Sequence, residues 1–287
     1  MTAAGKLGVK HFALAVVLTA ITLGATGLAV ADDLLTRTRA GAPLRIGFSN
    51  ERPWAFPDES GKAAGLMNVV AINTLKAMGI TNIEPVVVEW NSLIPGLQAG
   101  RYDMITGGMY VLKTRCDSIV FSDPVIRMGD VFGVPKGNPK KIETFEDIKN
   151  QNSVLVTTAG NNTVEVAKKV GITDDKIMQV PGPTEMLAAV LSNRADAAGT
   201  NYFSIKALVD QSDGKLEITD LNKMPEWTLN WAAMGFREED KSFIEEYNQF
   251  QKKYIGSAEM MSSVAEYGYT KDNLPGNVAT DWLCKNR

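Results

Sequence analysis

The stretch NIEPVVVEWNSLIPGLQAGRYDMITGG, residues 82–108, decides the fold class. It begins with an apolar, β-branched run, continues with a segment of helical length, and ends in a second strand-like run. Two strands that flank a helix form a βαβ unit, and repeated units of this kind build a parallel or mixed sheet. The sequence therefore predicts an α/β protein.

The same alternation continues on both sides of this unit. The strand LRIGFS and the helix LMNVVAINTLKAMG precede it, at residues 44–49 and 66–79. Beyond residue 150, predicted strands at 152–160, 176–182 and 195–201 alternate with predicted helices at 161–171, 183–194 and 202–211. The chain thus predicts two βα series, each long enough for a sheet with flanking helices.

Two segments predict the connections between these series. VFGVPKGNPKK, residues 131–141, places two prolines and two glycines after a strand, and we interpret it as the first crossing. NWAAMGF, residues 230–236, predicts the return strand. We therefore expect one discontinuous lobe made of residues 42–133 and 232–287, and a second lobe of residues 134–231, with a hinge of two crossings and a ligand cleft between the lobes.

The N-terminus predicts export. Two lysines precede an apolar run that ends in Ala29-Val30-Ala31, a small-x-small pattern typical of signal peptidase sites. We expect residues 1–31 to be a cleaved signal peptide and the mature protein to act in the periplasm. An uncleaved membrane anchor is the alternative for the same run.

Composition excludes several classes of function. Asp and Glu outnumber Lys and Arg by 33 to 30, which argues against binding to nucleic acid. The chain has one histidine, His11, and it lies within the predicted signal. Ser-His-Asp and Cys-His catalysis and most zinc chemistry are therefore excluded from the mature protein. Calcium-loop and phosphate-loop patterns are missing as well, so we expect no cofactor and no metal.

The two cysteines, Cys116 and Cys284, predict a disulfide, because an even pair in an oxidising compartment usually forms one. Such a bridge would tie the C-terminal helix to the first lobe. Two separate buried thiols are the alternative.

Three stretches resemble a known family: SLIPGLQAGRYDMITGGM (92–109), TRCDSIVFSDP (114–124) and LSNRADAAGTN (191–201). Together they resemble the type II periplasmic solute-binding proteins of the polar-amino-acid ABC transporter group, over nearly all of the mature chain. Within that group, NERPWAF (50–56), Trp90 and GGMYVLKTRC (107–116) are most similar to the ectoine/5-hydroxyectoine-binding proteins.

The resemblance assigns Arg115 to the carboxylate of the ligand, and the planar guanidinium fork suits that role. A surface arginine in a charged turn is the alternative. In the second lobe, TTAGNNTVEVA resembles the element of the family that opens a helix toward the same carboxylate. We expect Gly160 and Asn161 to contribute N–H groups there. An ordinary helix cap would use the same residue types.

At Asn201 the sequence departs from the amino-acid binders, which place an aspartate there to bind the α-ammonium group. A buried ammonium without a counter-charge is costly, so we interpret Asn201 as evidence against an ordinary α-amino acid. Trp54, Trp90 and Tyr110 are similar to the aromatic box of the ectoine binders, and such rings favour a diffuse cation. Packing in the core is the alternative for each ring. Glu51 would then accept the N–H groups of a ring cation.

The sequence thus predicts a monomeric binding protein and not an enzyme. We expect it to capture a small zwitterionic compatible solute, ectoine or 5-hydroxyectoine, and to deliver it to an ABC permease in the inner membrane. Polar, cyclic or betaine-type amino acids are alternative ligands. A cyclic-acid dehydratase with Glu51 as general acid is an alternative on the same fold.

Overall fold

A computed structural model describes residues 1–5 and 33–287, and the chain divides into two units, Met1–Ala31 and Asp32–Arg287. The fold below is that of the second unit. The predicted signal peptide, residues 1–31, and its cleavage site after Ala31 lie outside the described residues, apart from the first five. None of the described helices has the length and apolar character that crossing a membrane requires.

The first sheet has the strand order β4-β1-β5-β13-β6, and β7 also pairs with β13. Its strands are β1 (Leu44–Phe48), β4 (Ile83–Val87), β5 (Met104–Tyr110), β6 (Val120–Phe121), β7 (Ile126–Met128) and β13 (Asn230–Phe236). Strands β4, β1 and β5 are parallel, whereas β13 runs antiparallel to β5. The βαβ unit predicted from residues 82–108 is therefore present, as β4, α3 and β5.

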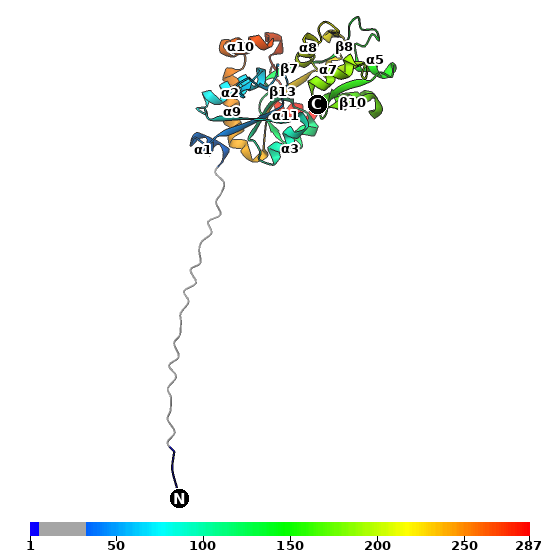
Figure 1. The fold of residues 1–287 in the computed structure, drawn as a ribbon. Helices are drawn as coiled ribbons and strands as arrows, with labels where there is room; N and C mark the ends of the chain where they lie inside the picture. The colour runs from blue at the N-terminus through cyan, green and yellow to red at the C-terminus, as the bar shows by residue number, and fades with distance from the viewer. Residues whose placement is uncertain (6–32) are drawn as a thin grey trace. The chain divides into compact units, whose positions relative to one another are not determined.

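Helices cover both faces of this sheet (Figure 1). They are α1 (Leu34–Arg39), α2 (Leu66–Ala77), α3 (Leu93–Gln98), α4 (Lys113–Cys116), α9 (Lys241–Tyr254), α10 (Ala258–Val264) and α11 (Thr280–Asn286). Met104 of β5 packs into the core with α2 and α9, while the next residue, Ile105, packs with α3 and α11. Successive side chains of a strand point to opposite faces, so a fully buried strand such as β5 supplies both cores.

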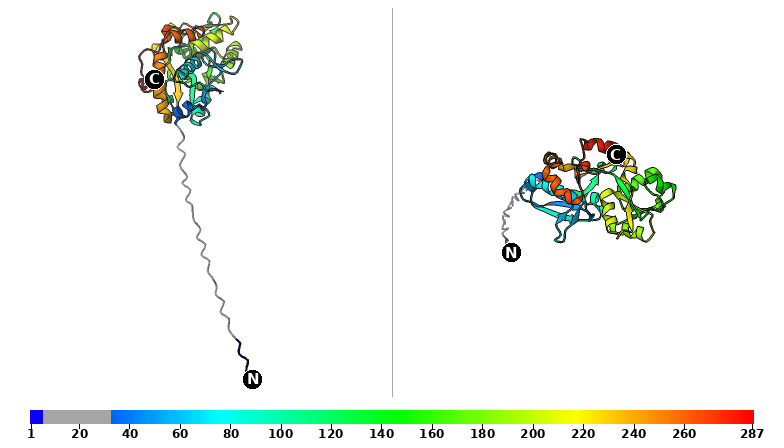
Figure 2. Two further views of the ribbon diagram at one scale, coloured as in Figure 1. Left: turned by 90° about the vertical axis from the view of Figure 1, so that its left-hand side faces the viewer. Right: turned by 90° about the horizontal axis from the view of Figure 1, so that it is seen from above.

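The second sheet has the order β10-β9-β11-β8-β12. Its strands are β8 (Asp130–Pro135), β9 (Leu155–Thr158), β10 (Ile177–Val180), β11 (Ala197–Asn201) and β12 (Leu216–Ile218), and its helices are α5 (Phe145–Asn150), α6 (Asn162–Val170), α7 (Pro183–Leu191) and α8 (Tyr202–Asp210). Val131 packs with α7 and α8, and Phe132 packs with α5 and α6. Figure 2 shows the second sheet and its helices beside the first from above.

A short hairpin lies outside both sheets, and its strands, β2 (Phe56–Pro57) and β3 (Ala63–Ala64), have two residues each. Short 3₁₀ turns occur at Trp90–Ser92, Asp174–Lys176, Leu221–Lys223, Glu226–Thr228, Glu238–Asp240, Ala265–Tyr267 and Lys271–Asn273.

Sheet membership locates the two crossings. Strand β7 ends at Met128 in the first sheet, and β8 begins at Asp130 in the second, so the chain crosses at Gly129. It returns before Asn230, where β13 begins to pair with β7. The expected boundaries at 133/134 and 231/232 fall inside β8 and β13, and we propose Gly129 and Leu229 in their place. The prolines and glycines that suggested 131–141 mark the end of β8 and the loop after it.

The fold class predicted from sequence, a two-lobed type II α/β binding fold, is confirmed by these sheets and crossings. The predicted bridge between Cys116 of α4 and Cys284 of α11 is formed as well. The chain therefore returns to its first lobe and is fastened there.

Candidate functional site

A small cavity lies where the strands of the two lobes end. Of the eight predicted ligand-binding residues, six line it: Glu51, Trp54, Trp90, Tyr110, Asn161 and Asn201. The other two, Arg115 and Gly160, contact these residues through hydrogen bonds. Its volume is about 10 Å³, which is no more than one water molecule needs. The lobes are therefore closed, and a solute can reach the site only when they part.

Local sequence explains how each side chain of the first lobe reaches the cavity. Glu51 and Trp54 follow the end of β1, Trp90 opens the turn after β4, and Tyr110 ends β5. The Trp54 ring needs Gly108, because a Cβ atom there would lie 2.7 Å from the ring, and the backbone of Gly108 has φ of +76°. Such a φ favours glycine. Gly108 thus lets the indole lie against β5.

Hydrogen bonds join the lobes directly across the cavity. The Trp54 indole N–H donates to Oδ1 of Asn201 at 2.8 Å, and the hydroxyl of Ser204 donates to Oε1 of Glu51 at 2.5 Å. Asn201 also caps α8, since its Oδ1 accepts from the N–H of Ser204. The Trp54 ring meets Phe203 edge to face, with 6.0 Å between centroids. Contacts between the protein's own groups therefore hold the two lobes together at this cavity.

Arg115 is a buried cation without an anionic partner among the described residues. Its side chain is 7% exposed, and it donates to the carbonyls of Tyr110 at 3.1 Å and Gly160 at 3.3 Å. None of the ion pairs among the described residues includes Arg115. Burial lowers the pKa of Arg115 to about 10, against the pull of nearby acids, so it is still charged at neutral pH. A desolvated guanidinium bonded only to carbonyls is suited to receive a carboxylate.

Trp90 packs against Arg115, with the guanidinium carbon 5.6 Å from the ring centroid. Its indole N–H donates to the carbonyl of Gly160 at 3.2 Å. One ring thus supports the cation of the first lobe and contacts the second lobe. A cation over an indole ring is favourable by about 0.5–2 kcal/mol.

The expectation for Asn161 needs a correction in this closed conformation, whereas that for Gly160 stays a prediction. The carbonyl of Gly160 accepts hydrogen bonds from Trp90 and Arg115, and its N–H group donates to no backbone acceptor among the described residues. The N–H of Asn161 donates to the carbonyl of Thr158 at 3.0 Å, in a turn that the positive φ of Gly160 permits. Asn161 caps α6 through its side chain, which accepts from the N–H of Thr163. The Asn161 N–H group, which was expected to bind the ligand, is therefore already bonded within the turn that begins the helix.

Asp130 lies behind the cavity lining, where it is bonded to Tyr110 and Asn162, and it was not predicted. It opens β8, pairs in register with Asn201, and is fully buried. Its carboxylate accepts from Nδ2 of Asn162 at 2.8 Å and from the Tyr110 hydroxyl at 3.3 Å. The signal that could have found it is a lone acid at the start of the otherwise apolar strand DVFGVP. Ser204, one turn into α8, gave no comparable signal.

Burial raises the pKa of both acids in the cleft. The pKa of Asp130 rises to about 6, although its bonds to Asn162 and Tyr110 and the charge of Arg115 oppose the shift. The pKa of Glu51 also rises, mainly through desolvation, against the bonds from Ser204 and Asn201. The charge of Arg115 acts on Asp130, whereas Glu51 is bonded to Ser204 of the second lobe. When both acids are ionised, these three groups together carry one net negative charge, which favours a ligand with a cationic group.

Asp130 leads to a prediction about stability and pH. Because its pKa is about 6 in the folded protein and ordinarily 3.8, ionisation in the folded state costs stability as pH rises between these values. Replacing Asp130 by asparagine should therefore raise the free energy of unfolding of the unliganded protein by ~1–3 kcal/mol at pH 7 and by little at pH 4. Urea unfolding at both pH values measures this. An equal effect at pH 4 and pH 7 would contradict it.

The chain matches known proteins over the whole of this fold. Residues 44–269 match the family model of the bacterial extracellular solute-binding proteins, family 3. The chain therefore belongs to that family of extracellular solute-binding proteins.

Individual relatives are moderately similar. The chain is 28% identical to a probable amino-acid ABC transporter periplasmic-binding protein of Sinorhizobium fredii, over 99% of this chain and 94% of that one. A crystal structure of EhuB in complex with hydroxyectoine has a TM-score of 0.80 and 25% identity, and the match covers 88% of this chain and 97% of that one. A mutant of the arginine-binding protein of T. maritima has a TM-score of 0.71 at 23% identity, over 82% and 98% of the two chains, which shows the fold alone.

Proposed function

We propose that this protein captures ectoine or 5-hydroxyectoine in the periplasm and delivers it to an ABC permease in the inner membrane. One observation carries the proposal. The buried Arg115, which has no carboxylate partner among the described residues, adjoins a cavity lined by Trp54, Trp90 and Tyr110 with Glu51 at its edge. A cationic side chain that can bind a carboxylate and a group of aromatic rings that can bind a diffuse cation therefore lie side by side.

In the bound state, the ligand carboxylate replaces carbonyl partners of Arg115 and accepts its two-pronged hydrogen bonds. The ring amidinium packs among the three aromatic side chains, where a weakly hydrated cation is stabilised by ring faces. Glu51 accepts an N–H group of that ring. The likeness to the hydroxyectoine complex supports this assignment.

The protein acts by binding alone, as a monomer, after the predicted signal peptide has been removed. The ligand must open the contacts of Trp54 with Asn201 and of Glu51 with Ser204, and new contacts from both lobes then close the cleft over it. Closure is a shift in population that is driven by contacts made only when both lobes engage the solute.

Asp130 favours a second candidate, a polar or cyclic α-amino acid. Asn201 argued against such ligands because an α-ammonium group would lack a counter-charge. Asp130 lies directly opposite Asn201 in the sheet and is buried behind Tyr110 and Asn162, which line the cavity. It can supply the missing charge in place of the aspartate that amino-acid binders carry at position 201. The similarity to an amino-acid binding protein of Sinorhizobium fredii agrees with this candidate.

Glu51 and Asp130 distinguish the two candidates. For ectoine, Glu51→Gln should raise the dissociation constant about 10- to 100-fold, because a charge-assisted bond is lost. Asp130→Asn should raise it less than about threefold, since Asp130 would not meet the ring cation. Isothermal titration calorimetry with ectoine, glycine betaine, proline and glutamine measures both effects.

The exposed Glu59 supplies the matched control, as Glu59→Gln removes an acid that does not line the cavity. If the protein binds glutamine or proline rather than ectoine, and Asp130→Asn has the larger effect, the amino-acid candidate is correct. Binding of none of the four solutes would refute both.

A further inference from the structure

Phe203 belongs to the second lobe, but its side chain is buried in the core of the first. It lies in the first turn of α8 and is 6% exposed. It packs in the hydrophobic cluster to which β1, β5, α2 and α9 contribute. Within the part of the chain that the structure describes, it is the only buried member of this cluster that comes from the second lobe. A ring of one lobe therefore fills a socket in the other.

Two residues of the first lobe shape this socket. Trp54 meets the Phe203 ring edge to face, with 6.0 Å between the ring centroids. Gly268 forms another wall, because a Cβ atom there would lie 3.3 Å from Cε1 of Phe203, and the φ of Gly268 is +84°. Both the short distance and the positive φ favour glycine. The first lobe thus leaves room for a ring that arrives from the second.

Phe203 must move with α8 when the lobes part. The N–H of Tyr202 donates to the carbonyl of Gly129, at the first crossing, at 3.2 Å. The Tyr202 ring also meets Phe203 edge to face, with 5.8 Å between centroids. Trp54 and Gly268 belong to the first lobe, so a rotation about Gly129 that opens the cleft withdraws the Phe203 ring from its socket.

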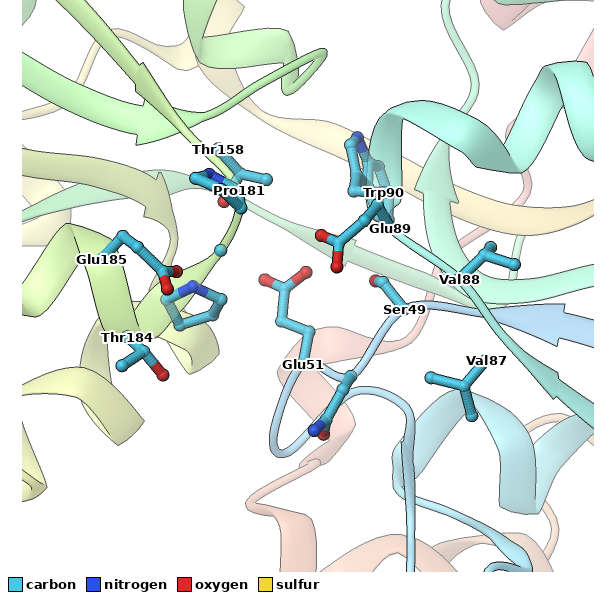
Figure 3. Close-up of a pocket in the computed structure, with 13 residues that line it drawn as sticks. Ser49, Glu51, Val87, Val88, Glu89, Trp90, Thr158, Pro181, Thr184 and Glu185 are labelled. Atoms are coloured by element: carbon cyan, nitrogen blue, oxygen red, sulfur yellow. The ribbon is translucent and has the colours of Figure 1, made fainter.

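The lobes are farther apart at the ends of β1 and β4. A pocket of about 470 Å³ separates them there. Figure 3 shows Pro181 and Thr184 of the second lobe on one side of this pocket and Val87 and Val88 of the first lobe on the other. Side chains separated by such a space bury little apolar surface against each other. The apolar contact that favours closure is therefore concentrated at the first turn of α8.

Phe203 does not line the ligand cavity, whereas Trp54 does. The Phe203 ring lines instead a groove of about 330 Å³ on the seam between the lobes, together with Lys206 of α8 and Tyr267 of the first lobe. A solute in the cavity would thus contact Trp54, and Phe203 contacts the same indole from outside the cavity. Any effect of Phe203 on a solute must act through Trp54 and through lobe closure.

We propose that Phe203 is a positioning residue that latches the lobes in the closed conformation and holds the Trp54 ring at the ligand cavity. The ring enters its socket when the lobes close, with or without a solute, and the burial of its apolar surface favours the closed conformation. The latch does not depend on the chemistry of the solute. It rests on the proposed function only in that Trp54 belongs to the solute site.

Small-angle X-ray scattering of the unliganded protein tests the latch without any solute. Phe203→Ala should populate the open conformation and increase the radius of gyration, because the ring no longer fills its socket. Phe203→Leu keeps much of the apolar volume and should give an intermediate radius. Both variants should fold, since Phe203 belongs to neither core cluster of the second lobe. If Phe203→Ala does not fold, Phe203→Leu decides.

Phe250→Ala is the matched control. Phe250 is a half-buried ring of α9 that packs on the first-lobe cluster from within that lobe, so this variant should have the radius of the native chain. Equal radii for the native chain and the Phe203 variants would overturn the proposal.

Stopped-flow tryptophan fluorescence tests the effect on bound solutes, with ectoine, proline and glutamine released by dilution. Release should be about tenfold faster from Phe203→Ala than from the native chain, by the same factor for each solute that binds. Faster release without a larger radius would mean that Phe203 contacts the solute itself, and the latch would be refuted. If none of the three solutes binds, the proposed function fails, while the scattering experiment still decides on the latch.

Discussion

Replacing Arg115 by alanine is expected to weaken binding of the cognate zwitterion about 100-fold or more. The ligand carboxylate would be left desolvated among aromatic rings, and losing one partner of a buried charge pair costs about 2–5 kcal/mol. Arg115→Lys should retain part of the affinity but lose about tenfold, because an ammonium group cannot bind a carboxylate with a planar fork. Calorimetric titration with ectoine, and with glutamine and proline as alternatives, measures both changes.

Arg101 provides the control for this experiment. It is an exposed arginine of the same lobe, in the loop before β5, and Arg101→Ala should bind as the native protein does. Circular dichroism and melting curves must show that Arg115→Ala is folded. We expect the variant to be no less stable than the native chain, since the desolvation of an unpaired cation is relieved. Undiminished binding by a folded Arg115→Ala would remove Arg115 from the site and the zwitterion model with it.

The periodicity of apolar residues and the positions of turn residues were sufficient to predict the fold class. The run from 82 to 108 is a βαβ unit, and NWAAMGF coincides with β13 at Asn230–Phe236. These features can be predicted locally. A strand repeats its apolar residues with a period of 2 and a helix with a period of 3.6, because each must keep its buried face apolar. A crossing between lobes has no such local pattern. Pairing in the second sheet begins at Asp130, a polar residue that precedes the apolar run of the strand.

Sequence predicted the site only in part. The first-lobe residues follow strand ends, and a strand end fixes where a side chain emerges, so Glu51, Trp54 and Tyr110 meet in one cavity as expected. Contacts across the cleft have no local signature. The pairing of Ser204 with Glu51 joins residues 153 positions apart, and nothing in the neighbourhood of either residue encodes it. The same holds for the direction in which Gly160 points its carbonyl.

Loss of the disulfide is expected to lower the free energy of unfolding by about 4–5 kcal/mol, because the bridge closes a loop of 168 residues and long loops gain the most from closure in the chain-entropy model. The measurement is urea unfolding of Cys116→Ser/Cys284→Ser beside the native chain, each with and without dithiothreitol. Reductant should destabilise the native chain to the level of the variant and should leave the variant unchanged. A difference below about 1 kcal/mol would contradict the estimate.

The bridge should also affect the ligand, because Cys116 follows Arg115 directly in α4. This helix is a single turn, and its N-cap residue, Leu112, makes no side-chain bond to it. The turn is held by the bridge to α11, by the N–H of Lys113 donating to the carbonyl of Arg287, and by Arg115 itself. Without the bridge the guanidinium must be ordered upon binding, so affinity should fall about 3- to 10-fold even at low temperature, where the variant is folded. If the variant binds as tightly as the native chain at 10 °C, the bridge supports only the fold, and Arg115 is positioned by Tyr110 and Trp90 alone.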